Sequence, residues 1–238
     1  MNKIIPLSLM LLMLIAAPTV RAQSEEDVGD LASFGREAKF FGYAATGTVY
    51  VSSDCSVYAP LGPDDRCYPV NAANGTATFD ARDLGRIQYP QKTFENVIYI
   101  LGRNTTSYHL INTSAQNRNG RIQFRPYLTL ESDALSDPSL INPLTGQPFN
   151  GRVDISLGGL RTFTKTLFPN YQESETFVYG ASSVSGITKK YLIDTFGLPA
   201  GVADGIFAGK MIIHLNIKGT TTWADDASFS CGARFLGN

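Results

Sequence analysis

The chain has 238 residues, with 20 Lys and Arg, 21 Asp and Glu, and a formal net charge of −1. This balance argues against a nucleic-acid partner, because nucleic-acid binding needs a concentrated basic surface. The length suits one large β domain or two small ones, and the lack of an internal repeat or low-complexity linker favours one.

A secretory leader is predicted for residues 1–22. Lys3 provides a positive start, residues 4–17 are apolar, and the run ending at Ala22 has the small-residue pattern of a cleavage site. Cleavage there leaves 18 basic against 21 acidic side chains, a net charge near −3. The rest of the sequence has no run approaching the ~20 apolar residues of a spanning helix. The leader resembles bacterial ones, so we expect a secreted or periplasmic product with no transmembrane segment after its removal.

The mature chain is expected to begin with an N-terminal arm over residues 23–43. Ser24 is a suitable N-cap, and Val28, Leu31 and Phe34 recur at roughly helical spacing. Two glycines weaken this helical pattern. A single β domain is expected over residues 44–238.

Two of the three cysteines are predicted to form a disulfide. Cys55 and Cys67 flank a loop rich in proline and glycine, and closely spaced cysteines usually pair in an oxidising compartment. Zinc is the rival interpretation, but it needs about four ligands, and only His109 and His214 are present as histidines. Cys231 lies on the apolar face of a strand-like run and is predicted to be free and buried. A bridge from Cys231 to either other cysteine remains the alternative, since the number of cysteines does not assign connectivity.

Short alternating runs recur along the rest of the chain and predict β-strands. In residues 121–131, Ile122, Phe124, Leu128 and Leu130 share one face, and Pro126 on that face indicates an edge or a bulge. Residues 97–102 are apolar on both faces and predict a central strand. Many such runs separated by Gly, Pro and Asn are typical of antiparallel sheets. The predicted fold is all-β, an antiparallel sandwich or barrel-like core with one or two short helices.

Two further segments break this pattern. Residues 132–151, from Ser132 to Gly151, contain three prolines and no convincing periodicity, so they predict a long loop with either a binding or a packing role. Residues 186–196 carry apolar side chains on one helical face. Gly197 and Pro199 follow, as expected after a helix. This segment is predicted to be a helix that covers one end of the β core.

No catalytic residue, metal ion or cofactor is predicted. The chain lacks the sequence motifs of serine hydrolases, zinc hydrolases and phosphate-binding loops. A Ser-His-Asp arrangement would have to use His109 or His214. Each lies in an apolar strand-like run, where a half-buried structural histidine is the commoner situation.

Acidic residues leave two chemical possibilities open. Glu173 and Glu175 are two apart in a strand-like run, so their carboxylates would lie roughly 6–7 Å apart on one face, close to the spacing in inverting glycosidases. The pairs Asp64-Asp65 and Asp225-Asp226 could supply oxygen ligands to calcium, although neither has the spacing of a calcium loop. In each case solvated surface or turn acids are the simpler interpretation.

Threonines and asparagines give weaker signals. Thr162, Thr164 and Thr166 line one face of a predicted strand and Thr220–Thr222 precede the single Trp, a pattern found in sugar-binding faces and in ordinary solvated strands. Asn74, Asn104 and Asn112 begin N-glycosylation sequons, which matter only in a eukaryotic secretory pathway.

Three hypotheses for function follow. The first is an exported, non-enzymatic β protein that acts by surface or ligand contact at or outside the cell envelope, with a glycan or an envelope surface as partner. The second is a binder of small molecules or carbohydrates with a pocket at one end of the β core. The third is a hydrolase that uses carboxylates.

Overall fold

The computed structural model describes residues 39–71, 75–92, 94, 97–157, 159–179 and 184–237. The predicted leader and residues 23–38 of the predicted arm lie outside the described residues.

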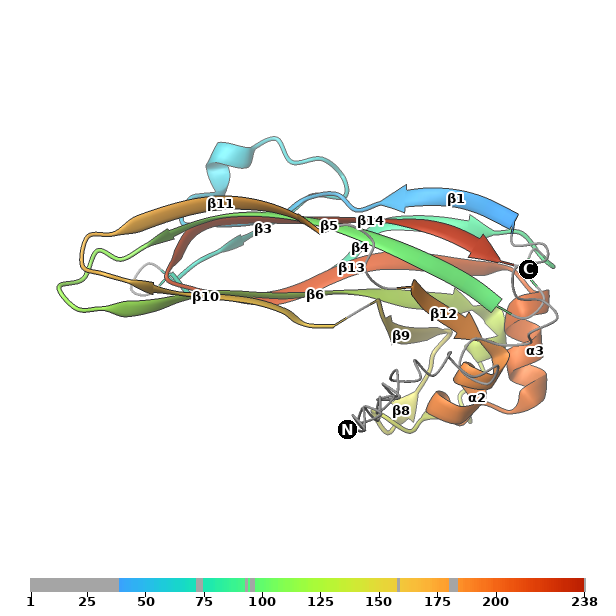
Figure 1. Ribbon diagram of the computed structural model, residues 1–238. Helices are drawn as coiled ribbons and strands as arrows, with labels where there is room; N and C mark the ends of the chain where they lie inside the picture. Colours follow the sequence, from blue (N-terminus) through green and yellow to red (C-terminus); the bar gives the residue numbers. More distant parts are fainter. Residues whose placement is uncertain are drawn as a thin grey trace, which may run out of the picture.

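Within the described residues, the chain forms two large β-sheets packed face to face, so the all-β prediction is confirmed and the fold is a sandwich (Figure 1). One sheet has seven described strands: β1 (Lys39–Ala45), β2 (Val49–Ser52), β3 (Arg66–Pro69), β5 (Val97–Ile111), β11 (Gln172–Tyr179), β12 (Val184–Thr188) and β14 (Ala224–Gly237). The other has five: β4 (Ala77–Tyr89), β6 (Arg118–Ser132), β9 (Arg152–Ser156), β10 (Arg161–Leu167) and β13 (Met211–Thr222). A small ribbon pairs β7 (Ile141–Asn142) with β8 (Gln147–Pro148).

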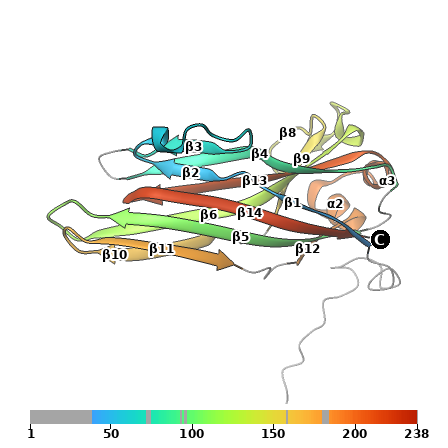
Figure 2. The same cartoon turned by 90° about the horizontal axis from the view of Figure 1, so that it is seen from above.

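Long strands form the middle of each sheet. In the seven-stranded sheet β5 pairs with β14, and in the five-stranded sheet β13 lies between β6 and β4 (Figure 2). The pairings among described strands are antiparallel except for β2 with β3, which is parallel. The chain crosses between the sheets after β3, β4, β5, β10, β12 and β13, and the crossings after β5, β10 and β13 lie at the end away from the helices (Figure 1). β5 pairs with β14 on one side and with β11 and β12 on the other, so it is an interior strand of the seven-stranded sheet, as the apolar run 97–102 predicted.

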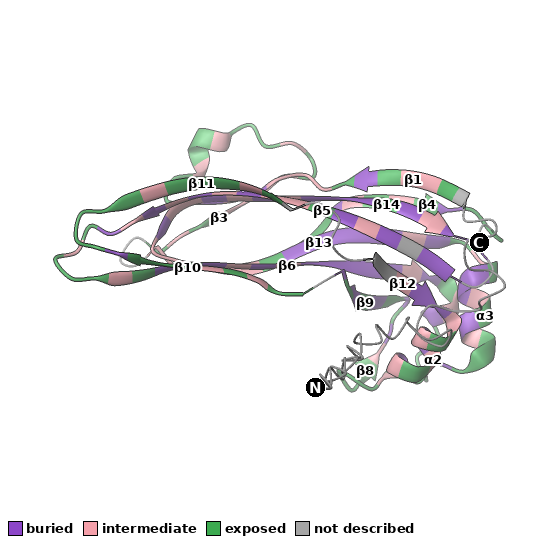
Figure 3. Cartoon of the chain, viewed as in Figure 1, coloured by how far each residue is buried: buried purple, intermediate pink, exposed green. Residues whose placement is uncertain are grey.

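Aromatic and aliphatic side chains fill the space between the sheets. The four apolar residues predicted to share a face of β6 are all buried, and buried residues alternate along the strands (Figure 3). The Phe229 ring lies 5.2 Å from both Phe79 and Phe124, centroid to centroid, so the rings of both sheets interdigitate. Burial of this kind stabilises by about 25 cal/mol per Å² of apolar surface.

Pro126 lies in β6, which has a partner strand on both sides. On one side β13 pairs along its whole length, but on the other β10 pairs only as far as Phe124 and β9 starts at Tyr127. Residues 125 and 126 therefore face a gap between β9 and β10. Pro126 therefore lies at a local edge, where β6 has no partner on one side, although β6 is an interior strand of the sheet.

Two helices, α2 (Lys189–Phe196) and α3 (Ala200–Ala208), cover one end of the sandwich (Figure 1). The prediction of a helix over 186–196 was wrong at its start, because residues 186–188 belong to β12 and Thr188 is the N-cap. Its end was right, since Gly197 takes a φ of 65°, the left-handed conformation that glycine adopts most readily. Pro199, expected only to stop a helix, directly precedes the unpredicted α3. Among the described residues, no helix is long and apolar enough to cross a membrane.

The long connection after β6 is mainly a packing element. It begins with the 3-10 helix η2 (Asp133–Leu135), whose Leu135 is fully buried. Phe149 is also buried, and its ring lies 6.4 Å from that of Phe196 on α2. The connection therefore packs between the ends of the sheets and the helical cap, which consists of α2 and α3. Packing was one of its two predicted roles.

The expected boundary between arm and β domain was also wrong. β1 begins at Lys39 and pairs with β14 from Lys39↔Gly237 to Ala45↔Gly232. Residues 39–43, assigned to the arm, are therefore part of the seven-stranded sheet.

Candidate functional site

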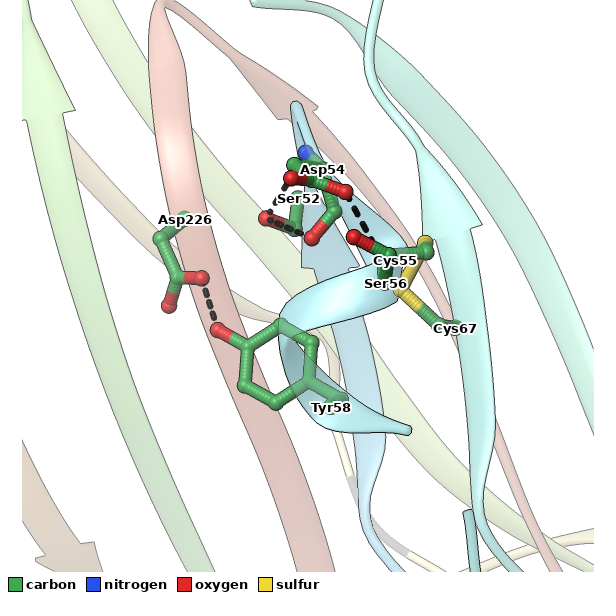
Figure 4. The surroundings of a disulfide bond; sticks show 7 residues. All are labelled: Ser52, Asp54, Cys55, Ser56, Tyr58, Cys67 and Asp226. Atoms are coloured by element: carbon green, nitrogen blue, oxygen red, sulfur yellow. Dashed lines mark hydrogen bonds between the residues drawn. A yellow bond between two sulfur atoms is a disulfide. The ribbon is translucent and has the colours of Figure 1, made fainter. Parts of the chain in front are cut away.

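The loop between the cysteines lies on the outer face of the seven-stranded sheet (Figure 1), and Figure 4 shows the residues around its disulfide. The disulfide Cys55–Cys67 is present, with the two Cα atoms 5.8 Å apart. It ties the 3-10 helix η1 (Cys55–Tyr58) to β3. The ring of Tyr58 stacks on Tyr50 at 4.0 Å, and its hydroxyl donates a hydrogen bond to Asp226. Disulfide, ring stack and hydrogen bond thus fix this loop against β2 and β14.

Of the two acids in that loop, Asp65 is used to hold the backbone. Its carboxylate accepts hydrogen bonds from the backbone N–H of Thr48 at 2.7 Å and of Gly62 at 3.0 Å. Asp64 is an exposed turn residue. Within the described ranges, no group of three or more His, Cys, Asp or Glu could hold a metal ion.

His109 lies in a row of polar residues across three strands of the same outer face. It is paired in register with Ser174 on β11 and with Asp226 on β14. These three residues help line a shallow pocket of about 350 Å³. His109 Nδ1 is 3.6 Å from Asp225 Oδ2, too long for a hydrogen bond, and Asp225 already accepts one from Ser53. The residue types are those of a serine hydrolase, but the hydrogen bonds that activate a nucleophile are not formed.

His214 lies on the outer face of the other sheet, inside a network of charges. It is 5% exposed, and its Nε2 is 3.1 Å from Glu131 Oε2. Its Nδ1 is 2.7 Å from Asp83 Oδ1 but is not aligned for a hydrogen bond. Arg152 binds the same Glu131 through Nε at 2.8 Å. His214 is therefore buried between two carboxylates, an arrangement that fits a structural residue.

This network also sets the pKa of Glu131. Burial acts to raise the pKa, but the hydrogen bond from Arg152 and the charges of Arg152 and His214 outweigh it and hold the pKa of Glu131 below its usual value. Glu131 therefore remains ionised in the folded protein at neutral pH.

Asn216 holds an irregularity in the neighbouring strand β4. The register shifts from Leu215↔Gly85 to Ile217↔Ala81, so three residues of β4 lie opposite Asn216 alone. Asp83, in the middle of this bulge, has a φ of 54° and donates its N–H to Asn216 Oδ1 at 2.8 Å. The sequence analysis missed this site, although the apolar spacing in β4 changes from two to three between Ala81 and Leu84.

A groove of about 670 Å³ crosses the outer face of the five-stranded sheet beside this network. Its side chains come from three adjacent strands and from the loop before β10: Thr78, Phe79, Asp80, Gln123, Arg125, Leu160, Lys218, Gly219 and Thr220. The hydroxyls of Thr78 and Thr220 are 3.4 Å apart, and Gln123 donates to Thr162 Oγ1 at 3.0 Å. Of the flagged threonines, Thr220 lines this groove and Thr162 contacts its lining residue Gln123, while Thr164 and Thr166 are exposed on β10.

Glu173 and Glu175 project from the inward-facing side of β11, but each has its own partner. Glu173 pairs with Lys165 at 2.8 Å and Glu175 accepts a hydrogen bond from Tyr108 at 3.0 Å. The hydrogen bond from Lys165 holds the pKa of Glu173 below its usual value. A general acid needs the opposite shift, so the geometry does not favour a catalytic pair here.

The remaining flagged residues serve the fold. Cys231 is free and buried, and burial raises the pKa of its thiol to about 12, so it is not a reactive thiol. Asn112 is fully buried, and its side chain bonds three backbone carbonyls, those of Gln116, Leu167 and Phe168. Asn104 lies in β5, and Asn74 lies outside the described residues.

Comparison with known proteins adds no relative. No protein-family model, curated protein or solved structure matches this chain.

Proposed function

We propose that the mature protein is an exported, non-enzymatic binding protein. It acts at or outside the cell envelope and holds a polar ligand, of the kind a glycan presents, in the groove on the outer face of the five-stranded sheet. A periplasmic or secreted location is supported by the predicted leader and by the disulfide, which forms and persists in oxidising compartments.

The observation that carries this proposal is the groove itself. Hydroxyl, amide and charged side chains from β4, β13 and β6 converge on one hollow of about 670 Å³ beside an exposed Leu160. Groups on long paired strands are held more precisely than groups on loops. A hollow with several convergent polar groups is the usual form of a ligand site. The predicted pocket at one end of the β core was not assigned to either end. Helices α2 and α3 cover one end, and the groove proposed here lies on a sheet face instead.

The groove favours binding over hydrolysis. A hydrolase that depends on carboxylates needs two of them to converge on one bond. Asp80 is the one carboxylate among the residues that line the groove. It already accepts hydrogen bonds from Tyr127 at 2.5 Å and Arg82 at 3.2 Å.

A glycan array with purified mature protein tests the binding proposal. Thr220→Trp fills the groove from its floor, while Thr164→Trp makes the same change on the same outer face beyond the groove. We expect saturable binding of at least one glycan, lost in Thr220→Trp and kept in Thr164→Trp. Equal binding by both variants would place the ligand elsewhere.

The export proposal has its own test. The full chain, expressed in a bacterium, should be recovered from the periplasm or the medium with an N-terminus at Gln23. Recovery from the cytoplasm with residues 1–22 intact would contradict it.

A further inference from the structure

We infer that the groove recognises a carboxylate on a sugar ring, so that the ligand is an acidic glycan containing uronic acid. The inference rests on the binding proposal above and adds the class of ligand. It is argued from the position of one arginine, from the charges around it, and from the groups beside it.

Arg125 lies at the gap between β9 and β10, where its own strand lacks a neighbour on one side. Its Nε is buried and has no hydrogen-bond partner. Among the described residues, no ion pair involves Arg125. Buried donors are nearly always paired in folded proteins, so an unpaired one on a residue that lines a groove indicates a place for an acceptor.

The charges around Arg125 favour an anion. Lys218 on β13 is its partner in register, and like charges directly opposite each other across strands repel. The Lys218 ammonium lies over the ring of Tyr127, 4.9 Å from the centroid, rather than on a carboxylate. Asp80 also lines the groove, opposite Lys218 in register, and Arg82 pairs with both Asp80 and Asp154. The charges of Arg82, Lys218 and Arg125 outnumber these two carboxylates by one. An anion bound between Arg125 and Lys218 would remove their repulsion.

The groups that line the groove then indicate which kind of anion it binds. The guanidinium is a planar fork that matches a carboxylate with two parallel hydrogen bonds. The hydroxyls of Thr78 and Thr220 lie beside it and can exchange hydrogen bonds with ring hydroxyls. Leu160, 54% exposed, offers an apolar surface to the C–H face of a sugar ring. A carboxylate, neighbouring hydroxyls and an apolar ring face occur together in a uronic acid.

The test compares three probes by titration calorimetry: an oligogalacturonide, its methyl ester and a sulfated oligosaccharide of similar length. The methyl ester has the same ring without the charge. Arg125→Gln removes the charge and fork at the proposed site. Arg121→Gln makes the same change two outward-facing positions further along β6, outside the groove.

We expect the oligogalacturonide to bind and its methyl ester to bind at least about tenfold more weakly. Arg125→Gln should weaken oligogalacturonide binding roughly 10- to 100-fold, as expected for loss of a charged hydrogen-bond pair. Arg121→Gln should change it less than about twofold. Arg125→Lys keeps the charge but loses the fork, so it should fall between wild type and Arg125→Gln. Thermal unfolding of all variants checks that each is folded.

The other outcomes separate this inference from the binding proposal. The acid and its methyl ester could bind equally, with binding unaffected by Arg125→Gln but lost in Thr220→Trp. That result would overturn the inference that the groove recognises a carboxylate and would leave the binding proposal standing. Tighter binding of the sulfated oligosaccharide than of the oligogalacturonide would also overturn the inference that the groove recognises a carboxylate. Binding of no glycan, on the array or in the calorimeter, would overturn both.

Discussion

Asn216 illustrates how one buried amide can hold a distortion of a sheet. It is fully buried, accepts the N–H of Asp83 in the β4 bulge, and donates to Thr129 Oγ1 at 2.9 Å. Thr129 in turn donates to Asp154 on β9, so the chain of bonds links four strands. These bonds keep the bulge, and with it Asp83, in place.

Replacement of Asn216 by Ala should lower the free energy of unfolding by about 1–3 kcal/mol. The variant removes the fully buried amide that pairs with the Asp83 N–H and with Thr129 Oγ1, and the loss of a buried hydrogen-bonding group costs about that much. Urea unfolding measures the change. Gln88→Ala, at an exposed position on β4, is the control and should stay within about 0.5 kcal/mol of wild type. Equal midpoints for the two variants would mean that the bulge is held by other contacts.

Glu131 should make stability depend on acid pH. Because its folded-state pKa lies below the unfolded value, its contribution is present above the unfolded pKa and is lost as the pH falls through the folded pKa. The side chain is about one-third exposed, so solvent screening limits this contribution to about 1 kcal/mol or less. Unfolding free energy measured from pH 7 to pH 3 should fall less steeply for Glu131→Gln than for wild type. Parallel curves would contradict the ion network.

At the scale of elements, the predicted start of α2 was too early because the local apolar pattern favours a helix where the tertiary structure forms a strand. Residues 186–188 fit the helical stripe, but they pair with β5 in register from Gly186↔Tyr99 to Thr188↔Val97. Helix α3 lacked a strong local signal, since Gly201 and Gly205 lower helix propensity. It forms because Ala203, Ile206 and Phe207 are buried against the rest of the cap.

Two glycine substitutions should separate these local and tertiary effects. Gly197→Ala should destabilise by about 1 kcal/mol, because the residue has a φ of 65° while space for a Cβ is free. Gly201→Ala, also with free space but inside α3, should stabilise by about 0.5–1 kcal/mol. Thermal and urea unfolding of the pair measures both signs. A loss of stability in both would mean that the cap tolerates no added side chain at either position.

At the scale of the molecule, the disulfide acts on the unfolded chain. Cys55 and Cys67 are 12 residues apart, and closing a loop of that size contributes about 3 kcal/mol in the chain-entropy account. Reduction, or replacement of both cysteines by Ala, should therefore lower the unfolding free energy by up to about 3 kcal/mol. A thiol reagent should find no reactive group in the folded, oxidised protein and one, Cys231, after unfolding. Rapid labelling of the folded protein would contradict the burial of Cys231.

Several properties followed from the sequence alone because they depend on local chemistry. Alternation of apolar residues over 121–131 predicted β6, since every second side chain of a strand faces the core. The C′ glycine at Gly197 predicted the end of α2 from its conformational freedom. The close spacing of Cys55 and Cys67 predicted their bridge.

Other properties required the tertiary structure because they join residues far apart in the chain. Asp83, Glu131, Arg152 and His214 meet only when β4, β6, β9 and β13 are aligned in one sheet. The groove is likewise formed by register, which places Lys218 opposite Arg125 and leaves Arg125 at a gap between two edge strands. Strand order and register are set by packing over the whole core, and a single strand's pattern carries no information about which strand will lie beside it.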